Sequence, residues 1–341
     1  MKKFICRLPI DCVLAVTYNC NARCVMCDIW KIKNFSELAP EQFLKLPASL
    51  RDVNISGGEP FLRRDLPQII HNVKKACPAA RLVISTNGFA TGLILAQMRK
   101  IFEIKPNIGI AISIDGIGEK HDEMRGIRGG FNMAMKTLEG LKRMGMKNLR
   151  LGFTVTERNI NELGRVYNLA RKEGVEFTNS FAQSSDIYFG GKQNTDFKDM
   201  DSGSGAGMTK EVLRAQYRHL IRAELSGWNI KRWARAYYAH GMYNFITGKQ
   251  AELSSAPGRD FFFLDPSGEI YPSVVHNFRM GNIRAVQGFE QFWCSSASEG
   301  VREKIDAAKL PVWMICTART AIKKHPFKVG WWVLKNKFSV R

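Results

Sequence analysis

Short apolar runs and amphipathic stretches alternate along the first half of the chain, and this alternation limits the folds that the sequence can adopt. The runs are rich in β-branched side chains, which is typical of strands buried on both faces of a parallel sheet. They span residues 12–17, 52–56, 81–86, 107–114, 148–155 and 175–181. The stretches between them show helical spacing of apolar residues and span 40–46, 65–76, 91–102, 131–144 and 160–173.

Six strand–helix units in succession predict an α/β fold whose core is an open, partial (β/α)6 barrel of the TIM type. Such barrels carry their chemistry on the loops after the carboxyl ends of the strands. Residues 261–273 have the pattern of a β-hairpin, so we expect a smaller α+β extension after the barrel. The predicted segments are the barrel core 1–183, a flexible loop 184–210, a basic helical segment 211–250, the extension 251–320 and a basic aromatic tail 321–341.

Apolar length and cysteine usage favour a cytoplasmic protein. No apolar run reaches the roughly eighteen residues of a membrane-spanning helix. The first apolar run is interrupted by Arg7, Pro9 and Asp11, unlike that of a signal peptide. Eight cysteines are too few for a secreted disulfide scaffold in a chain of this length. Five of them are therefore expected to be buried, small apolar side chains: Cys6, Cys12, Cys77, Cys294 and Cys316.

The other three cysteines form a compact motif directly after the first predicted strand. Cys20, Cys24 and Cys27 have the spacing C-x3-C-x2-C. Three thiolates bind three irons of a [4Fe–4S] cluster and leave the fourth iron open. An open iron can take the amino and carboxylate groups of a methionine moiety. A structural zinc site that lacks a fourth ligand is the alternative for such a triplet.

The cysteine motif and the strand ends that follow it resemble those of the radical S-adenosylmethionine (SAM) superfamily. The second strand ends in Gly57-Gly58-Glu59-Pro60 and the third in Thr86-Asn87-Gly88, which are similar to the family's GGEP and TNG elements. The resemblance implies that Glu59 accepts hydrogen bonds from the methionine ammonium. The implied cofactors are a [4Fe–4S] cluster and SAM.

The fourth strand and the segment after it extend this resemblance. Ser113, in Ser113-Ile114-Asp115-Gly116, matches a position that contacts the ribose or carboxylate of SAM, and Arg125 matches an arginine that pairs with the carboxylate. Met26 stands where many relatives carry an aromatic residue near the adenine. The SAM-binding residues implied by the resemblance are Met26, Gly57, Gly58, Glu59, Pro60, Asn87, Ser113, Asp115 and Arg125.

The predicted hairpin resembles the start of a SPASM or twitch domain, which marks one branch of the superfamily. Ala256 and Ser273 occupy places where relatives usually have cysteines. Either the auxiliary cluster is lost and the domain is degenerate, or unusual ligands such as His276 complete it. Without an auxiliary cluster, redox-neutral outcomes such as epimerisation, elimination or C–C bond formation are favoured over dehydrogenation.

The charge is strongly basic, with a formal net charge of +20. A solvated surface, an anionic substrate, a membrane surface and nucleic acid are all compatible with it. The sequence contains no recognisable RNA-binding module, which argues against nucleic acid. Lys210, Arg214, Arg218 and Arg222 recur every four residues and form one helical stripe.

The tail 321–341 carries six lysines and arginines and no acidic residue. Phe327, Trp331, Leu334 and Phe338 fall on one face of a helix. Two readings follow: peripheral contact with an anionic membrane, or docking of these aromatic residues on the barrel.

These features favour an enzyme that cleaves SAM and abstracts hydrogen from an anionic small molecule, such as a phosphorylated, nucleotide-linked or lipid-linked sugar. A flavodoxin or ferredoxin is the expected electron donor. Alternatives are an enzyme that modifies a peptide or RNA, and a membrane-associated enzyme that modifies lipids. The loop after the sixth strand offers candidate substrate contacts: Gln183, Ser184, Asp186 and Tyr188.

Overall fold

A computed structural model describes residues 6–182, 185, 210–249, 252–309 and 312–338. Its centre is a sheet of nine strands in the order β6-β5-β4-β3-β2-β1-β7-β8-β9. Strands β1 to β7 are parallel to one another, and β8 pairs antiparallel with both β7 and β9. The strands are β1 Asp11–Thr17, β2 Asp52–Gly57, β3 Arg81–Thr86, β4 Gly109–Ser113, β5 Leu149–Val155, β6 Glu176–Phe181, β7 Phe261–Leu264, β8 Glu269–Tyr271 and β9 Gly281–Asn282.

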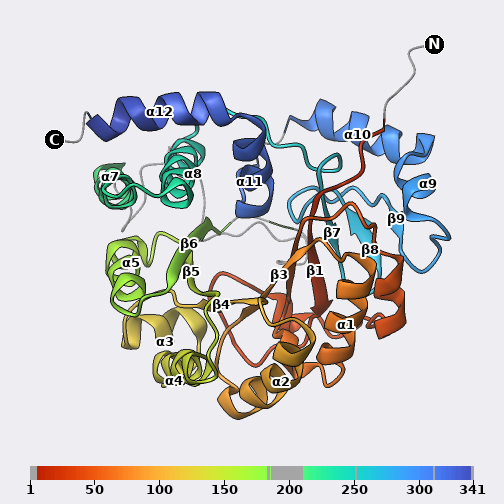
Figure 1. The fold of residues 1–341 in the computed structure, drawn as a ribbon, viewed down its shortest axis with the longest axis horizontal. Coiled ribbons are helices and arrows are strands. Elements are labelled where there is room, and N and C mark those ends of the chain that lie inside the picture. Colours follow the sequence, from red (N-terminus) through yellow and green to blue (C-terminus); the bar gives the residue numbers. More distant parts are fainter. Residues whose placement is uncertain (1–5, 183–184, 186–209, 250–251, 310–311, 339–341) are drawn as a thin grey trace.

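Helices follow the parallel strands and cover the outside of the sheet (Figure 1). In the barrel they are α1 Leu66–Ala76, α2 Thr91–Ile104, α3 Glu119–Arg125, α4 Gly130–Arg143 and α5 Leu163–Lys172. The later helices are α7 Lys210–Leu225, α8 Ile230–Ile246, α9 Phe289–Trp293, α10 Ser296–Ala308, α11 Ile315–Lys324 and α12 Pro326–Phe338. Short 3-10 helices are η1 Ile29–Lys31, η2 Pro40–Lys45, η3 Pro60–Leu62 and η4 Ile160–Glu162.

The predicted partial barrel is confirmed: the sheet is open, with β6 and β9 at its edges. Each of the six predicted strands is present, with bounds within two residues of the expected ones. The stretch 40–46 forms a 3-10 helix that begins at Pro40. Helix α3 was not among the predicted helices; it is seven residues long, too short for a periodic pattern to be clear.

The expected hairpin is also present, and it continues the barrel sheet. β7 pairs in parallel with β1, with Asp11 opposite Phe261 and Leu14 opposite Leu264. All four residues of β7 are buried, so the extension shares the barrel's core. The division of the chain into five segments stays a prediction.

Helix α11 fixes the amino-terminal ends of the strands through ion pairs. Arg319 lies 2.6 Å from the carboxylate of Asp11, at the start of β1, and Lys323 lies 3.0 Å from Asp52, at the start of β2. Lys324 pairs with Asp260, just before β7. Burial raises the pKa of Asp11 to about 7, although Arg319 opposes that rise.

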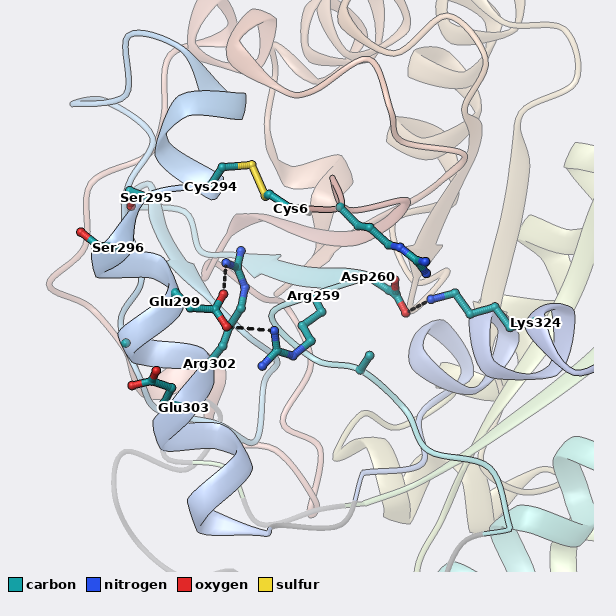
Figure 2. Close-up of a pocket in the computed structure, with 13 residues that line it drawn as sticks. Cys6, Arg259, Asp260, Cys294, Ser295, Ser296, Glu299, Arg302, Glu303 and Lys324 are labelled. Atoms are coloured by element: carbon teal, nitrogen blue, oxygen red, sulfur yellow. Dashed lines mark hydrogen bonds and ion pairs between the residues drawn. A yellow bond between two sulfur atoms is a disulfide. The ribbon is translucent and has the colours of Figure 1, made fainter. Parts of the chain in front are cut away.

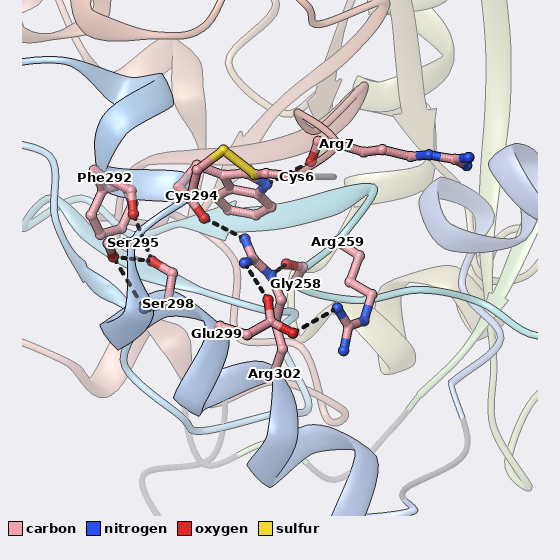
Figure 3. Close-up of a disulfide and its surroundings, with 11 residues drawn as sticks. Cys6, Arg7, Gly258, Arg259, Phe292, Cys294, Ser295, Ser298, Glu299 and Arg302 are labelled. Carbon is pink, nitrogen blue, oxygen red and sulfur yellow. Dashed lines mark hydrogen bonds and ion pairs between the residues drawn. A yellow bond between two sulfur atoms is a disulfide. The ribbon is translucent and has the colours of Figure 1, made fainter. Parts of the chain in front are cut away.

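Cys12, Cys77 and Cys316 are buried, as expected. The prediction for Cys6 and Cys294 was wrong, because these two exposed residues form a disulfide. The indole of Trp293 donates a hydrogen bond to the carbonyl of Arg7, and this contact holds the amino-terminal segment beside the end of α9 (Figure 3). The two Cα atoms are then 5.6 Å apart, within the range that a disulfide requires.

None of the helices in the described residues combines the length and apolar content that a membrane-spanning helix needs.

We predict that Arg319→Met destabilises the fold in a pH-dependent way. The variant leaves the buried carboxylate of Asp11 without its nearest cation, and Lys323 is the other cation that lowers the pKa of Asp11. The free energy of unfolding should fall by about 3–5 kcal/mol near pH 8. The pKa of Asp11 is raised in the fold and should rise further without Arg319. As the pH falls, the folded variant therefore binds a proton on Asp11, which removes the unpaired buried charge. The loss should therefore shrink below about pH 6.

Denaturant unfolding at the two pH values measures this effect. Arg81→Met is the matched control, because Arg81 pairs with Asp52 from an exposed position and should change stability by about 1 kcal/mol or less. A loss for Arg319→Met that is equal at both pH values would contradict the account.

Candidate active site

A cavity of about 380 Å³ lies at the carboxyl ends of the parallel strands, where barrels of this type carry their chemistry. Cys20, Cys24 and Cys27 all line it. Other predicted site residues that line it are Met26, Gly57, Gly58, Asn87, Ser113 and Arg125. The strand ends therefore bring together residues that are up to 105 positions apart, from Cys20 to Arg125.

The loop that carries the cysteines is held from two sides. The backbone N–H of Arg23 donates to the carbonyl of Arg125, and that of Val25 donates to the carbonyl of Met124, both at 3.0 Å. From the loop after β3, the amide of Asn87 donates to Asn21 at 2.7 Å and lies 4.0 Å from the sulfur of Cys20. These contacts fix the thiols against the neighbouring strand ends.

The chemistry of the three thiols fits an iron–sulfur cluster. Burial raises the pKa of Cys20 to about 11 and that of Cys27 to about 12, so these groups carry protons until a metal replaces them. In the described ranges, no three Cys, His, Asp or Glu side chains converge as ligands of one metal ion. Three thiols that line one cavity suit a [4Fe–4S] cluster, in which each thiolate binds its own iron.

The backbone at Gly57 and Gly58 lies so close to that of residues 17–19 that only glycine fits there. A Cβ atom on Gly57 would lie 2.3 Å from the carbonyl oxygen of Thr17, and one on Gly58 would lie 2.2 Å from that of Asn19. Gly57 also has a φ of +121°, which other residues rarely adopt. These glycines let the end of β2 pack against the start of the cysteine loop, so their first role is to hold that loop.

Glu59 is fully buried and ties two loops together. Its carboxylate accepts hydrogen bonds from the N–H groups of Phe61 and Asn87 and from the hydroxyl of Thr86. Burial raises the pKa of Glu59 to about 7 against these hydrogen bonds. The predicted contact of Glu59 with the methionine ammonium stays a prediction, because this side chain lies behind the residues that line the cavity.

Arg125 is the one charged side chain among the described residues that line the cavity. Its guanidinium lies 2.6 Å from Asp115 and donates to the sulfur of Cys24 at 3.6 Å. Burial alone would lower the pKa of Arg125, but Asp115 and the Cys24 sulfur raise it above its usual value. A permanently charged guanidinium beside a cluster ligand is suited to pair with a carboxylate.

Asp115 has a structural role in this arrangement. It is completely buried, pairs with Arg125 and accepts a hydrogen bond from the N–H of Thr154 at 2.7 Å. Asp115, like Glu59 and Pro60, is not among the residues that line the cavity. The candidate contacts Gln183, Ser184, Asp186 and Tyr188 lie outside the described residues. Ser185, between them, lines the cavity and donates to the carbonyl of Val274.

Sequence reasoning missed the polar side chains that line the cavity from the strands themselves. They are small hydroxyl and amide residues within the strands. Asn54 and Ser56 of β2 lie at alternate positions and so share one face of the strand, a pattern that could have revealed them. Ser85 donates to Asn54 across two neighbouring strands at 3.0 Å. The set is Asn54, Ser56, Ser85, Thr154, Thr178, Asn179 and Ser180.

A larger cavity, of about 640 Å³, lies beside the disulfide and helix α10 (Figure 2). It contains arginines and glutamates that pair with each other, such as Arg259 and Arg302 with Glu299. No residue of the cysteine motif or of the strand-end motifs lines it. The smaller cavity is therefore the candidate active site.

Comparison with known proteins agrees with this geometry. Residues 14–170 match the radical SAM superfamily. The chain therefore contains a radical SAM domain. The radical SAM assignment made from the motifs is confirmed, and so are the predicted cofactors, because the superfamily uses a [4Fe–4S] cluster and its structures bind SAM. The placement on the SPASM/twitch side of the superfamily stays a prediction.

Individual relatives give a similar picture. Pre-heme d1 synthase from Dinoroseobacter shibae is 32% identical over 73% of this chain and 61% of that protein. The sporulation killing factor maturation protein SkfB from Bacillus subtilis is 25% identical over 81% of this chain and 63% of that protein. This chain thus spans less than two thirds of the length of these two relatives.

The structure of anSMEcpe with bound AdoMet has the same fold. The TM-score is 0.60 at 13% identity, and the match covers 98% of this chain and all of that one.

We predict that anaerobic reconstitution yields about one [4Fe–4S] cluster per chain, since one complete thiol triplet is present. Replacing Cys20, Cys24 and Cys27 together by Ala should abolish the cluster. Iron and sulfide analysis measures the result. Cys77→Ala is the matched control, because that buried thiol lies outside the cavity, and it should leave the iron content unchanged. Full iron content in the triple variant would contradict the assignment.

We also predict that Arg125→Leu weakens SAM binding by about ten- to a hundredfold, because a charge-assisted pair is lost, while iron content is retained. Equilibrium titration with SAM measures the affinity. Since the single variant leaves Asp115 buried without its cation, the double variant with Asp115→Asn separates folding from binding. It should recover stability but not affinity. Wild-type affinity in the double variant would place the carboxylate partner elsewhere.

Proposed function

We propose that this protein is a radical SAM enzyme that cleaves SAM reductively and abstracts a hydrogen atom from a substrate. The observation that carries the proposal is the shared cavity, in which the cysteine triplet, the two glycines and Arg125 meet. A thiol triplet with an adjacent guanidinium supplies three cluster ligands and one partner for the carboxylate of SAM.

When bound, the cluster and SAM supply the chemistry: one electron splits a sulfonium C–S bond into methionine and a 5′-deoxyadenosyl radical. The chain's own residues hold and orient these groups. The cysteines bind iron, and Arg125 orients the carboxylate of SAM. Met26, which is 7% exposed and precedes Cys27, covers a face of the adenine.

The lining of the cavity bears on the substrate. Apart from Arg125, the described residues that line it are neutral, and many carry hydroxyl or amide groups. Such groups recognise a neutral, hydroxyl-rich moiety through hydrogen bonds. We therefore propose that the ring of a sugar enters the cavity, and that a phosphate, nucleotide or lipid-linked group of the same molecule stays outside it, where the basic surface can bind it.

A peptide is the second candidate substrate. SkfB is named as a maturation protein, and the mycofactocin maturase MftC from Mycolicibacterium smegmatis is 25% identical over 84% of this chain. Backbone amides would also be satisfied by the hydroxyl and amide side chains of the cavity. A redox-neutral outcome, such as epimerisation, elimination or C–C bond formation, remains our preferred reaction type.

The proposed setting is the cytoplasm, with a flavodoxin or ferredoxin as electron donor and with a peripheral membrane contact through the tail.

A SAM-cleavage assay tests the proposal. Reconstituted protein with dithionite and SAM should release 5′-deoxyadenosine, and the Cys20→Ala variant should release none. Candidate sugars or peptides deuterated at carbon should transfer deuterium into 5′-deoxyadenosine only when they are substrates. Failure of the reduced, cluster-loaded protein to cleave SAM would overturn the proposed activity. Transfer from peptides alone would select the second candidate.

A further inference from the structure

Helix α12 is apolar on two opposite faces. On one face Val329 and Val333 are buried, and the ring of Trp332 packs against Tyr237 and His240 of α8, with ring centroids 5.3 and 4.8 Å apart. This face attaches α12 to the body of the protein. The docking that the sequence left open as an alternative thus takes place, but through these residues and not through the predicted stripe.

The predicted stripe lies on the other side of the helix. Phe327 is 92% exposed, Trp331 73%, Leu334 47% and Phe338 60%. At about 100° per residue, these side chains lie on the side opposite Val329 and Val333. An exposed apolar patch of this size marks an interaction surface, and the described residues leave this side of α12 uncovered.

The turn between α7 and α8 adds to the same surface. Trp228 is 75% exposed and Ile230 is 80% exposed. The ammonium of Lys337, in the last turn of α12, lies 4.5 Å from the centre of the Trp228 ring, so the turn lies beside the end of α12. Figure 1 shows α12 running across α7 and α8 at the periphery of the molecule. We call this surface the apolar face; it comprises Trp228, Ile230, Phe327, Trp331, Leu334 and Phe338.

The charges beside the apolar face are positive. By helical spacing, Lys328 and Lys335 flank the stripe on one side and Lys337 flanks it on the other. Lys328 donates to the carbonyl of Glu252, and Lys337 to those of Leu225 and Gly227, so their charges are not neutralised by these contacts. Residues 321–341 contain no Asp or Glu.

The apolar face with its flanking lysines could bind either a second copy of the chain or an anionic membrane, and the charges favour the membrane. A second copy of the chain would bring two lysine-flanked faces together, and a formal charge of +20 on each copy opposes such contact. An anionic bilayer accepts both parts of the surface, because aromatic side chains enter the headgroup region while lysines extend to the lipid phosphates.

We propose that the apolar face binds the surface of an anionic membrane, with α12 lying in the plane of the interface. Lys323 and Lys324, just before α12, pair with Asp52 and Asp260, at the amino-terminal ends of β2 and β7. The cysteine loop follows the opposite end of β1, a strand about 20 Å long. The cysteine loop and the active-site cavity thus lie at the opposite ends of the strands from these ion pairs.

Co-sedimentation of the full-length protein with vesicles tests this proposal. Vesicles of phosphatidylcholine with phosphatidylserine should bind the protein, and binding should fall as salt is added. Vesicles of phosphatidylcholine alone should bind it much more weakly. Phe327→Ser with Trp331→Ser should weaken binding by about tenfold or more, since two exposed aromatic side chains are lost, with SAM cleavage unchanged.

A matched pair of leucines controls for general surface effects. Leu334→Ser should weaken binding, whereas Leu93→Ser, on a similarly exposed leucine of α2 (41%), should not. Thermal unfolding shows that each variant is folded. The proposal is overturned if the folded wild type ignores anionic vesicles at low salt, or if both leucine variants behave alike. It is also overturned if the wild type forms dimers that the aromatic variant loses, because the apolar face is then a self-interface.

Discussion

The parallel pairing of β1 with both β2 and β7 is the interaction on which the candidate site depends. Because parallel strands end at the same edge of a sheet, the pairing of β1 with β2 brings the cysteine loop and the glycine pair to one cavity, and the pairing of β2 with β3 adds the loop after β3. The glycines allow the contact to be close enough for Gly58 N–H to donate to the Thr17 carbonyl at 2.7 Å. At the other end of the same strands, α11 supplies the cations that neutralise Asp11, Asp52 and Asp260.

Arg125 connects the electrostatics of the site to its architecture. The carbonyl of Arg125 holds the cysteine loop, while its guanidinium spans a buried carboxylate and a cluster-ligand sulfur. Asp115 cannot remain charged and buried without that guanidinium, and the guanidinium is in turn aimed by Asp115. One residue therefore supports the loop that binds iron and supplies the only charge that the described lining offers to SAM.

The sequence predicted the parts of the molecule whose signals are local. β-branched runs identified the six barrel strands, and contiguous motifs identified the residues from Cys20 to Arg125 that meet at the strand ends. Pairings over long separations were not predictable: β7 joins β1 from about 250 residues away and Cys6 meets Cys294 across 288 residues. Glu59 and Asp115 do not line the cavity, and their contacts with SAM stay predictions, because sequence motifs do not distinguish residues that touch a ligand from residues that position them.

The central claim is that three thiolates hold a cluster whose fourth iron is open to SAM. Electron paramagnetic resonance of the reduced, reconstituted protein, recorded with and without SAM, tests it most directly. The account predicts one [4Fe–4S]+ signal whose g values change when SAM is added, because SAM becomes a ligand of the open iron. A reduced-cluster signal that is identical in the presence and absence of saturating SAM would contradict it.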